Sequence, residues 1–305
     1  MQPFEQATAL LPDFLRALLA AVPEDVRGRA TELRLRAGGP VAVTTPEGPL
    51  YLSHGGVSPF FQNNGPRLTA EQLNLTLRAI CGYSVHSYTQ DIARGFVTLP
   101  GGHRAGVCGT AVCENGVVTA VREISSINLR IARQIPGAAA RLCREFYQGG
   151  ALPNVLISGP PGSGKTTMLR DLALRLSSGL CGPCRRVALI DERGELAGAR
   201  GAEPCCGVGP NTDVLTGYPK GEGILLAIRS LSPEVIVCDE LGGLPDAAAL
   251  EAGLGAGVRF AATVHAGSAQ EAVDRPVVRR LLDLRAFQAL AHLSSPGEYA
   301  VHTLP

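Results

Sequence analysis

Apolar residues in the first part of the chain recur at helical spacing and then in short alternating runs. From Phe4 to Val22 they fall on one helical face, which predicts a single amphipathic helix that packs on its own domain. Strand-like runs follow at 32–36 and 41–44, and the Gly-Gly-Pro sequence at 38–40 predicts a turn between them. The chain is therefore expected to begin with a helix and a β-hairpin.

Helical spacing returns after a stretch rich in Gly, Pro and Asn. Thr69 and Gln72 stand in the positions of a capping box, which predicts a helix from Thr69 to about Cys81. A second helix is expected at about 84–94.

Alternating residues then predict a series of strands. Asn115 and Gly116 form the dipeptide that most strongly indicates a tight hairpin turn. The predicted strands lie at 96–99, 104–113, 117–121 and 127–132. Residues 1–136 are therefore predicted to form a smaller, mixed α+β domain.

The pattern changes in the second half of the chain. A helix at 138–147, within a linker at 137–150, is expected to lead to a domain at 151–305. Buried runs rich in β-branched residues then alternate with helical segments, as in a parallel sheet with helices on both faces. These runs lie at 155–158, 187–190, 235–238 and 258–264. The second domain is therefore predicted to belong to the α/β class.

Composition excludes several classes of protein. The 305 residues are 45% hydrophobic and 18% charged, which is ordinary for a globular protein. The formal charge of +1 gives no reason to expect nucleic acid as a partner. No apolar run reaches the ~18 residues of a membrane span, and the first residues lack the basic start of a signal peptide. We expect a cytoplasmic protein.

Nine cysteines are scattered along the chain, and free thiols are the expected state. Cys181 and Cys184 have thioredoxin-like spacing, which leaves open a redox role or, together with Cys205 and Cys206, a four-thiolate zinc site. A simple turn between a helix and a strand is the plainer interpretation.

The strongest chemical signal is a glycine-rich loop that follows a predicted strand and begins a helix. It reads Gly159-Pro160-Pro161-Gly162-Ser163-Gly164-Lys165-Thr166-Thr167. In such a P-loop, backbone N–H groups and the helix N-terminus cradle phosphates. Lys165 would reach the β- and γ-phosphates, and the Thr166 hydroxyl would bind Mg²⁺. The sequence therefore predicts a P-loop NTPase with a RecA-like sheet and with ATP and Mg²⁺ as its cofactors.

A hydrolase also needs carboxylates near the metal and the attacking water. Asp239 and Glu240 follow the buried run at 235–238, so we expect Asp239 on the metal side and Glu240 as the general base.

Two further strand ends carry candidate residues. Asp191 or Glu192 could position the water, although a solvated acidic loop is the alternative. His265 could contact the γ-phosphate, although a structural histidine is nearly as well supported.

Taken together, these motifs resemble the stage III sporulation protein AA family of endospore-forming bacteria, a branch of the secretion ATPase superfamily. The matching strings lie at 32–36, 95–104, 124–132, 159–167, 191–193, 212–215 and 230–233. The N-terminal strings are the specific part of this resemblance, because a P-loop alone occurs in many unrelated proteins.

The resemblance implies further roles. The segment 191–195 is similar to the aspartate box of secretion ATPases, and His265 to their histidine box. These motors are hexameric rings, and a neighbouring subunit supplies arginines to the γ-phosphate. Arg104, Arg130 and Arg133 stand at comparable places, although each could equally be a surface charge.

Two positions depart from the family pattern. Gly243 stands where an arginine often follows the acidic pair, and Asn211 replaces an arginine often found before Thr212. If such arginines contact the nucleotide or a neighbouring subunit, their replacement predicts weaker coupling in this protein. Nucleotide binding should be less affected.

Three functions are compatible with these observations. The first is a motor that energises a secretion-like channel between mother cell and forespore, peripheral to the forespore membrane and partnered by membrane proteins of a sporulation channel. The alternative is a nucleotide-gated assembly scaffold with little turnover. A small-molecule kinase fits the P-loop but leaves the N-terminal domain unexplained.

Overall fold

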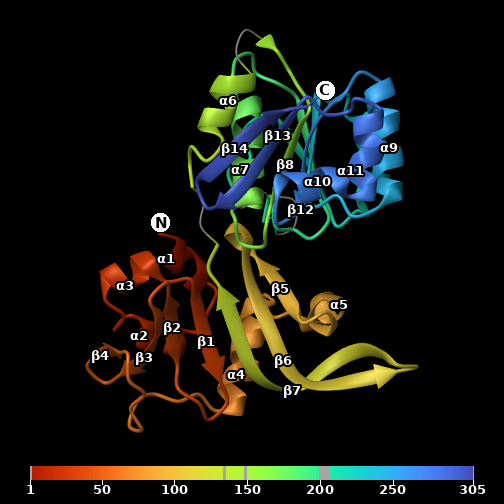
Figure 1. The fold of residues 1–305 in the computed structure, drawn as a ribbon. Helices are drawn as coiled ribbons and strands as arrows, with labels where there is room; N and C mark the ends of the chain where they lie inside the picture. The colour runs from red at the N-terminus through yellow and green to blue at the C-terminus, as the bar shows by residue number, and fades with distance from the viewer. Residues whose placement is uncertain (1, 133–134, 148–149, 199–205, 305) are drawn as a thin grey trace. The chain divides into compact units, whose positions relative to one another are not determined.

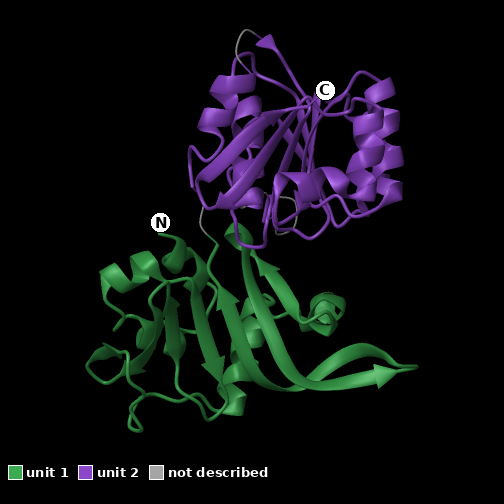
Figure 2. Ribbon diagram, viewed as in Figure 1, with its two compact units in different colours: residues 1–133 green, residues 134–305 purple. Residues whose placement is uncertain are grey.

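The computed structural model describes residues 2–132, 135–147, 150–198 and 206–304 (Figure 1). The chain divides into two compact units, residues 1–133 and residues 134–305 (Figure 2). Each unit contains a seven-stranded sheet. Among the described residues, no helix is both long enough and apolar enough to cross a bilayer.

An antiparallel sheet forms the centre of the first unit. In spatial order its strands are β4 (Gly56–Ser58), β3 (Gly48–Ser53), β2 (Ala42–Thr45), β1 (Glu32–Arg36), β7 (Val117–Arg130), β6 (His103–Glu114) and β5 (Phe96–Leu99). Asn115 and Gly116 have positive φ angles of 50° and 78° in the turn between β6 and β7, which confirms the predicted hairpin. The strands predicted at 117–121 and 127–132 are one strand, because bulges keep β7 paired with β6 along its length.

Helices and short 3₁₀ turns pack around this sheet. They are α1 (Pro3–Thr8), α2 (Asp13–Leu19), α3 (Glu24–Arg29), α4 (Ala70–Ile80), η1 (Val85–Tyr88), α5 (Thr89–Ala93) and η2 (Pro100–Gly102). The prediction of one helix from Phe4 to Val22 is wrong. Pro12 lacks the N–H group that a helix interior needs, so α1 ends before it and α2 begins after it.

The capping box predicted at the start of α4 is confirmed. The backbone N–H of Gln72 donates to Oγ1 of Thr69 at 3.1 Å, and the backbone N–H of Thr69 donates to Oε1 of Gln72 at 2.9 Å. The helix expected at 84–94 is instead the turn η1 followed by the short helix α5.

The second unit is built on a mainly parallel sheet. In spatial order its strands are β10 (Thr212–Thr216), β9 (Val187–Asp191), β11 (Val235–Cys238), β12 (Arg259–His265), β8 (Val155–Gly159), β13 (Ala289–Ser295) and β14 (Glu298–Thr303). Only β14 runs antiparallel to its neighbour. The four predicted strands of this domain are present, and β10, β13 and β14 extend the sheet at its edges.

Helices cover both faces of this sheet (Figure 1). They are α6 (Ala140–Phe146), α7 (Lys165–Ser177), α8 (Lys220–Ser230), α9 (Leu244–Gly255), α10 (Ala269–Asp274) and α11 (Pro276–Asp283). One apolar cluster contains Leu142 of α6 and Leu169 of α7, and another contains Ile224 of α8 and Leu250 of α9. The helix expected in a linker, α6, therefore contributes to the core of the second unit.

Candidate functional site

The candidate residues of the second unit gather where parallel strands end. Strands β9, β11, β12 and β8 lie side by side in that order, and their last residues are Asp191, Cys238, His265 and Gly159. Asp239 follows directly after β11. In open α/β sheets, ligands bind at this carboxyl edge. The fold thus brings together side chains that are far apart in the sequence.

The glycine-rich loop connects β8 to α7, as its sequence predicts. Gly162 and Gly164 have φ angles of 78° and 94°, which residues with a side chain rarely adopt. A Cβ atom on Gly159 would lie 2.7 Å from the backbone carbonyl oxygen of Leu293, so this position requires a glycine. Nζ of Lys165 donates to the carbonyl oxygens of Gly159 and Pro160 at 2.9 and 2.8 Å.

Lys165 is a buried cation. Burial lowers the pKa of its ammonium below the ordinary value of 10.5, and the carboxylates of Asp239 and Glu240 oppose this shift. The buried Oγ of Ser163 has no hydrogen-bond partner among the described residues. The loop thus contains a cation and a polar atom suited to anionic oxygens.

Asp239 connects the start of α7 to strand β12, which lies next to β8. Oγ1 of Thr166 donates to Oδ2 of Asp239 at 2.8 Å, and Oγ1 of Thr263 donates to Oδ1 of the same carboxylate. Thr263 lies on β12, two residues before His265. Thr263 could not be predicted, because a threonine inside a buried strand gives no signal of such a contact.

Glu240 adopts a backbone conformation that is rare for residues other than glycine, with a φ angle of 53°. Its carboxylate lies 2.9 Å from a guanidinium nitrogen of Arg193 and 3.4 Å from Nε2 of His265. Nδ1 of His265 is buried and has no hydrogen-bond partner among the described residues. Glu240 and His265 therefore lie next to each other, as a shared site requires.

The two carboxylates after β9 have different surroundings. Asp191 is buried and accepts hydrogen bonds from the backbone N–H groups of residues 195–197 at 2.8–3.1 Å, so its oxygens hold this loop in place. Burial raises the pKa of Asp191, and these N–H groups partly offset the shift. Glu192 is exposed and lies 3.5 Å from Nζ of Lys220. Of the two, Glu192 has the accessible carboxylate.

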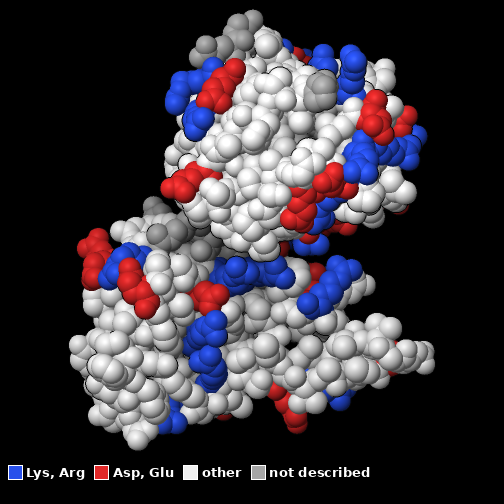
Figure 3. All heavy atoms as spheres, in the orientation of Figure 1, with Lys and Arg blue, Asp and Glu red and all other residues white. Residues whose placement is uncertain are grey.

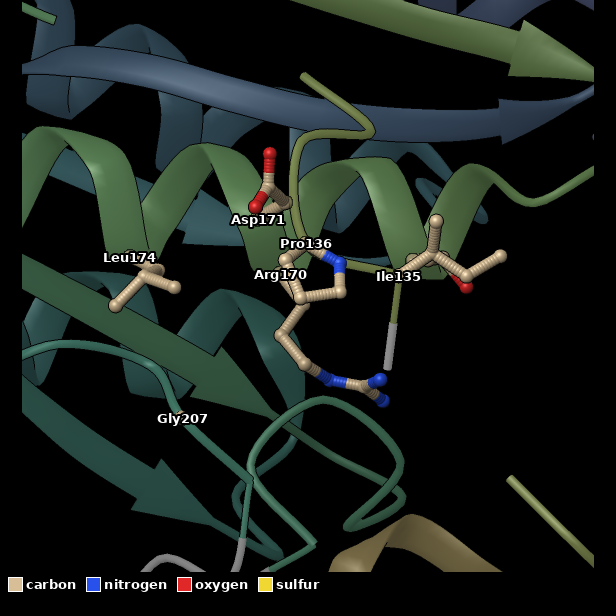
Figure 4. A pocket seen from close by; sticks show the side chains of 7 residues that line it. Ile135, Pro136, Arg170, Asp171, Leu174 and Gly207 are labelled. Carbon is tan, nitrogen blue, oxygen red and sulfur yellow. The ribbon is translucent and has the colours of Figure 1, made fainter. Parts of the chain in front are cut away.

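A small pocket beside α7 is lined by Thr167, Arg170 and Asp171, among other residues (Figure 4). The guanidinium of Arg170 donates to the carbonyl oxygens of Glu195 and Leu196, each at 2.6 Å. Asp171 accepts hydrogen bonds from the backbone N–H groups of Gly137 and Ala139. Helix α7 thus anchors both the loop after β9 and the segment that begins the second unit.

The candidate arginines belong to the first unit. Arg104 on β6 and Arg130 on β7 are paired in register, and positive side chains gather on the visible face of this sheet (Figure 3). The guanidinium of Arg104 stacks on Phe96, and that of Arg130 lies 3.8 Å from Glu32. Arg133 lies outside the described residues. A role for these arginines at a nucleotide stays a prediction.

The expectation that all cysteines are free thiols is wrong, because Cys143 on α6 and Cys181 after α7 form a disulfide. Cys181 is therefore not available for the proposed zinc site. No group of three or more candidate metal-binding side chains occurs among the described residues, and Cys205 lies outside them. Cys184 keeps its thiol, whose Sγ donates to the carbonyl oxygen of Ser177.

Nearly the whole chain matches a known protein family. Residues 1–301 match the family described as sporulation stage III, protein AA. The stage III sporulation protein AA of Bacillus subtilis (strain 168) is 38% identical over 286 residues, which are 93% of this chain and 89% of that protein.

Solved structures show the same fold at low sequence identity. The ATPase DotB of Legionella pneumophila has a TM-score of 0.56 and 16% identity, covering 95% of this chain and 79% of its own. The pilus retraction motor PilT, solved with bound ADP, has a TM-score of 0.53 and 18% identity, covering 92% and 76%. These similarities confirm the predicted fold, a RecA-like P-loop domain preceded by an N-terminal domain.

Proposed function

Because the chain belongs to the sporulation stage III protein AA family and folds like secretion-system ATPases, we propose that it is an ATP-hydrolysing motor of the secretion type. In this proposal it energises a secretion-like channel between mother cell and forespore. The observation that carries the proposal is the meeting of Lys165, Thr166, Asp239 and Glu240 at one edge of the sheet.

The glycine-rich loop fits the phosphates of ATP. Its glycines allow the backbone to turn around an anion. Lys165 offers a buried cation, and Ser163 offers a hydroxyl that has no hydrogen-bond partner within the described part of the chain. In the proposal, Lys165 exchanges the carbonyl oxygens of Gly159 and Pro160 for phosphate oxygens. Gly164 is the N-cap of α7, so the N-terminus of this helix also favours the negative charge.

The pair formed by Thr166 and Asp239 fits Mg²⁺. This ion takes oxygen ligands and is commonly held in nucleotide sites by one or two protein groups together with phosphates. A hydroxyl and a carboxylate 2.8 Å apart at the start of the P-loop helix supply such a set. Bound there, Mg²⁺ would neutralise charge on the phosphates.

Glu240 is the proposed general base, and Glu192 is the second candidate. The carboxylate of Glu240 is only partly exposed and contacts both Arg193 and His265, which limits its orientation. In the proposal, His265 reports the state of the γ-phosphate to Glu240.

The proposal extends to the assembled molecule. Secretion ATPases work as rings, and we propose a hexamer in which Arg104 or Arg130 reaches the nucleotide of a neighbouring subunit. We propose that the assembly lies in the cytoplasm, at the mother-cell side of the forespore membrane, bound to membrane proteins of a sporulation channel.

Replacement of the proposed base tests this function. Glu240→Gln should lower steady-state phosphate release by about 100-fold or more and leave the binding of a fluorescent ATP analogue intact. Glu222→Gln, which changes an exposed carboxylate on α8, is the matched control. Wild-type turnover by Glu240→Gln would remove Glu240 from the role of base. A comparable loss in Glu192→Gln alone would transfer the role to Glu192.

The alternative function is a nucleotide-gated scaffold that binds ATP with little turnover. It is favoured by Gly243 and Asn211, which stand where the family often has arginines. Negligible phosphate release by an assembled, nucleotide-bound sample would support it against the motor.

A further inference from the structure

The use of lysine in this chain is unusual. Of its 28 lysine and arginine residues, only two are lysines, Lys165 and Lys220. Both are buried, at 6% and 7% relative exposure. One is the lysine of the glycine-rich loop. The other lysine, Lys220, stands at a buried position outside the family motifs quoted above, in a chain whose remaining Lys or Arg positions are all arginine.

Lys220 lies at the carboxyl edge of the same sheet. It is the first residue of α8, and its Nζ donates to the backbone carbonyl oxygen of Glu240 at 2.6 Å. The same Nζ is 3.5 Å from a carboxylate oxygen of Glu192 and 3.8 Å from one of Asp246. One ammonium therefore joins the loop after β9, the residue after Asp239 and the first turn of α9.

The backbone around Glu240 is held from several sides. Its N–H donates to Oγ1 of Thr263 at 2.7 Å, and the N–H of Leu241 donates to the carbonyl oxygen of Thr263 at 2.8 Å. The N–H of Gly242 donates to Asp246 at 2.9 Å. Nζ of Lys220 donates to the carbonyl oxygen of Glu240. Such support is what a non-glycine residue with a φ angle of 53° requires.

We propose that Lys220 is a positioning residue for ATP hydrolysis, which holds Glu240 in the conformation that directs its carboxylate toward Arg193 and His265. The inference rests on the proposed function, because it assigns Lys220 a role in that reaction. Lys220 acts through the backbone of Glu240 and, by charge, links it to Glu192. Displacement of a catalytic group by even a small distance lowers the rate strongly.

The chemistry of the ammonium explains why arginine does not stand here. Three N–H donors on one small nitrogen can point at a carbonyl and two carboxylates on different elements, whereas a guanidinium presents a planar, rigid fork. The position is nearly closed to solvent, so the larger group would have to displace its neighbours.

Three variants test the inference by their kcat for phosphate release and their Kd for a non-hydrolysable ATP analogue. Lys220→Met should lower kcat at least about tenfold and change Kd less than about twofold. Lys220→Arg, which keeps the charge, should give an intermediate kcat. Arg229→Met, which removes an exposed cation from the same helix, is the control and should behave like the wild type.

A double variant separates positioning from a merely structural role. If Lys220 acts through Glu240, then Lys220→Met combined with Glu240→Gln should release phosphate as slowly as Glu240→Gln alone. A further fall by the factor seen for Lys220→Met in the wild type would overturn the inference. An unchanged kcat in Lys220→Met would also overturn the inference, whether its Kd for the ATP analogue stays the same or becomes larger.

The outcomes are distinguishable from failure of the proposed function. A wild type without phosphate release rejects the ATPase itself before any variant is compared. If Lys220→Met does not fold, Lys220→Arg decides: reduced kcat at unchanged Kd and thermal midpoint supports the inference, and wild-type kcat overturns it.

Discussion

Single buried side chains fix the loop that follows β9. Asp191 receives backbone N–H groups from this loop, and Arg170 donates to two of its carbonyl oxygens. Asp191 thus binds N–H groups of this loop and Arg170 binds its carbonyl groups, next to Glu192. The position of Glu192 at the site therefore depends on the buried side chains of Asp191 and Arg170.

Replacement of Arg170 should show this dependence. Arg170→Met leaves the carbonyl oxygens of Glu195 and Leu196 without their charged donor, so the free energy of unfolding should fall by about 1.5–3 kcal/mol. Chemical denaturation measures the change, with Arg229→Met as the exposed control. Equal stability of the two variants would show that water replaces the guanidinium at no cost.

His292 should make stability depend on pH. Its Nδ1 lies 2.9 Å from Oγ of Ser158, and burial, followed by the neighbouring His302, lowers its pKa below the ordinary 6.5. The unfolded chain then binds a proton more readily than the folded one, so this contribution to stability is complete above pH 6.5 and is lost as pH falls through the folded pKa.

Denaturation curves across this pH range test the effect. The free energy of unfolding of the wild type should fall more steeply below pH 6.5 than that of His292→Gln. Parallel pH profiles would exclude His292 as the source of the slope.

A disulfide joins two elements of the second unit covalently. It connects α6 to the turn after α7 and closes a loop with a sequence separation of 38 residues. Cys143→Ser should lower the free energy of unfolding by about 2–4 kcal/mol under oxidising conditions. Reductant should lower the wild type to the same value and leave the variant unchanged.

An exposed free cysteine supplies the control for that experiment. Cys113→Ser, on β6, should retain wild-type stability and wild-type sensitivity to reductant. A wild type that is indifferent to reductant would contradict a stabilising disulfide.

Elements with strong local signals could be predicted, and those fixed by distant contacts could not. The strands that carry the site are buried, β-branched runs, and Thr69 and Asn115 mark a cap and a turn by their own chemistry. Strand β10 was missed because it contains Asp213 and lies at an edge, where polar residues are tolerated. Strand β13 was not predicted because its sequence, in which alanine and leucine are mixed with histidine and serine, is not a β-branched run like those of the other buried strands.

The site shows the same division. Asp239 and Glu240 could be predicted, because residues that follow buried parallel strands meet at one edge. Thr263 and Lys220 could not, because one lies within a strand and the other begins a helix. Their contacts with Asp239 and Glu240 depend on strand order, which the sequence does not state.

At the scale of the whole molecule, the proposed ring predicts a nucleotide-dependent mass. A non-hydrolysable ATP analogue with Mg²⁺ should shift the purified protein from smaller species to about six copies, because in the proposed ring the nucleotide contacts two subunits. Mass photometry measures this directly. Lys165→Ala should stay small under the same conditions, and a wild type whose mass ignores the analogue would contradict a nucleotide-built ring.

The rate of phosphate release from the wild type decides whether this protein is an ATPase. Three samples receive ATP. They are the wild type with Mg²⁺, the wild type with a chelator instead of Mg²⁺, and Lys165→Ala with Mg²⁺ as the baseline. We predict sustained release that requires both Mg²⁺ and Lys165, because in the proposed site the loop, Thr166 and Asp239 contact the phosphates and the metal together. Release from the wild type that is no faster than from Lys165→Ala would contradict it.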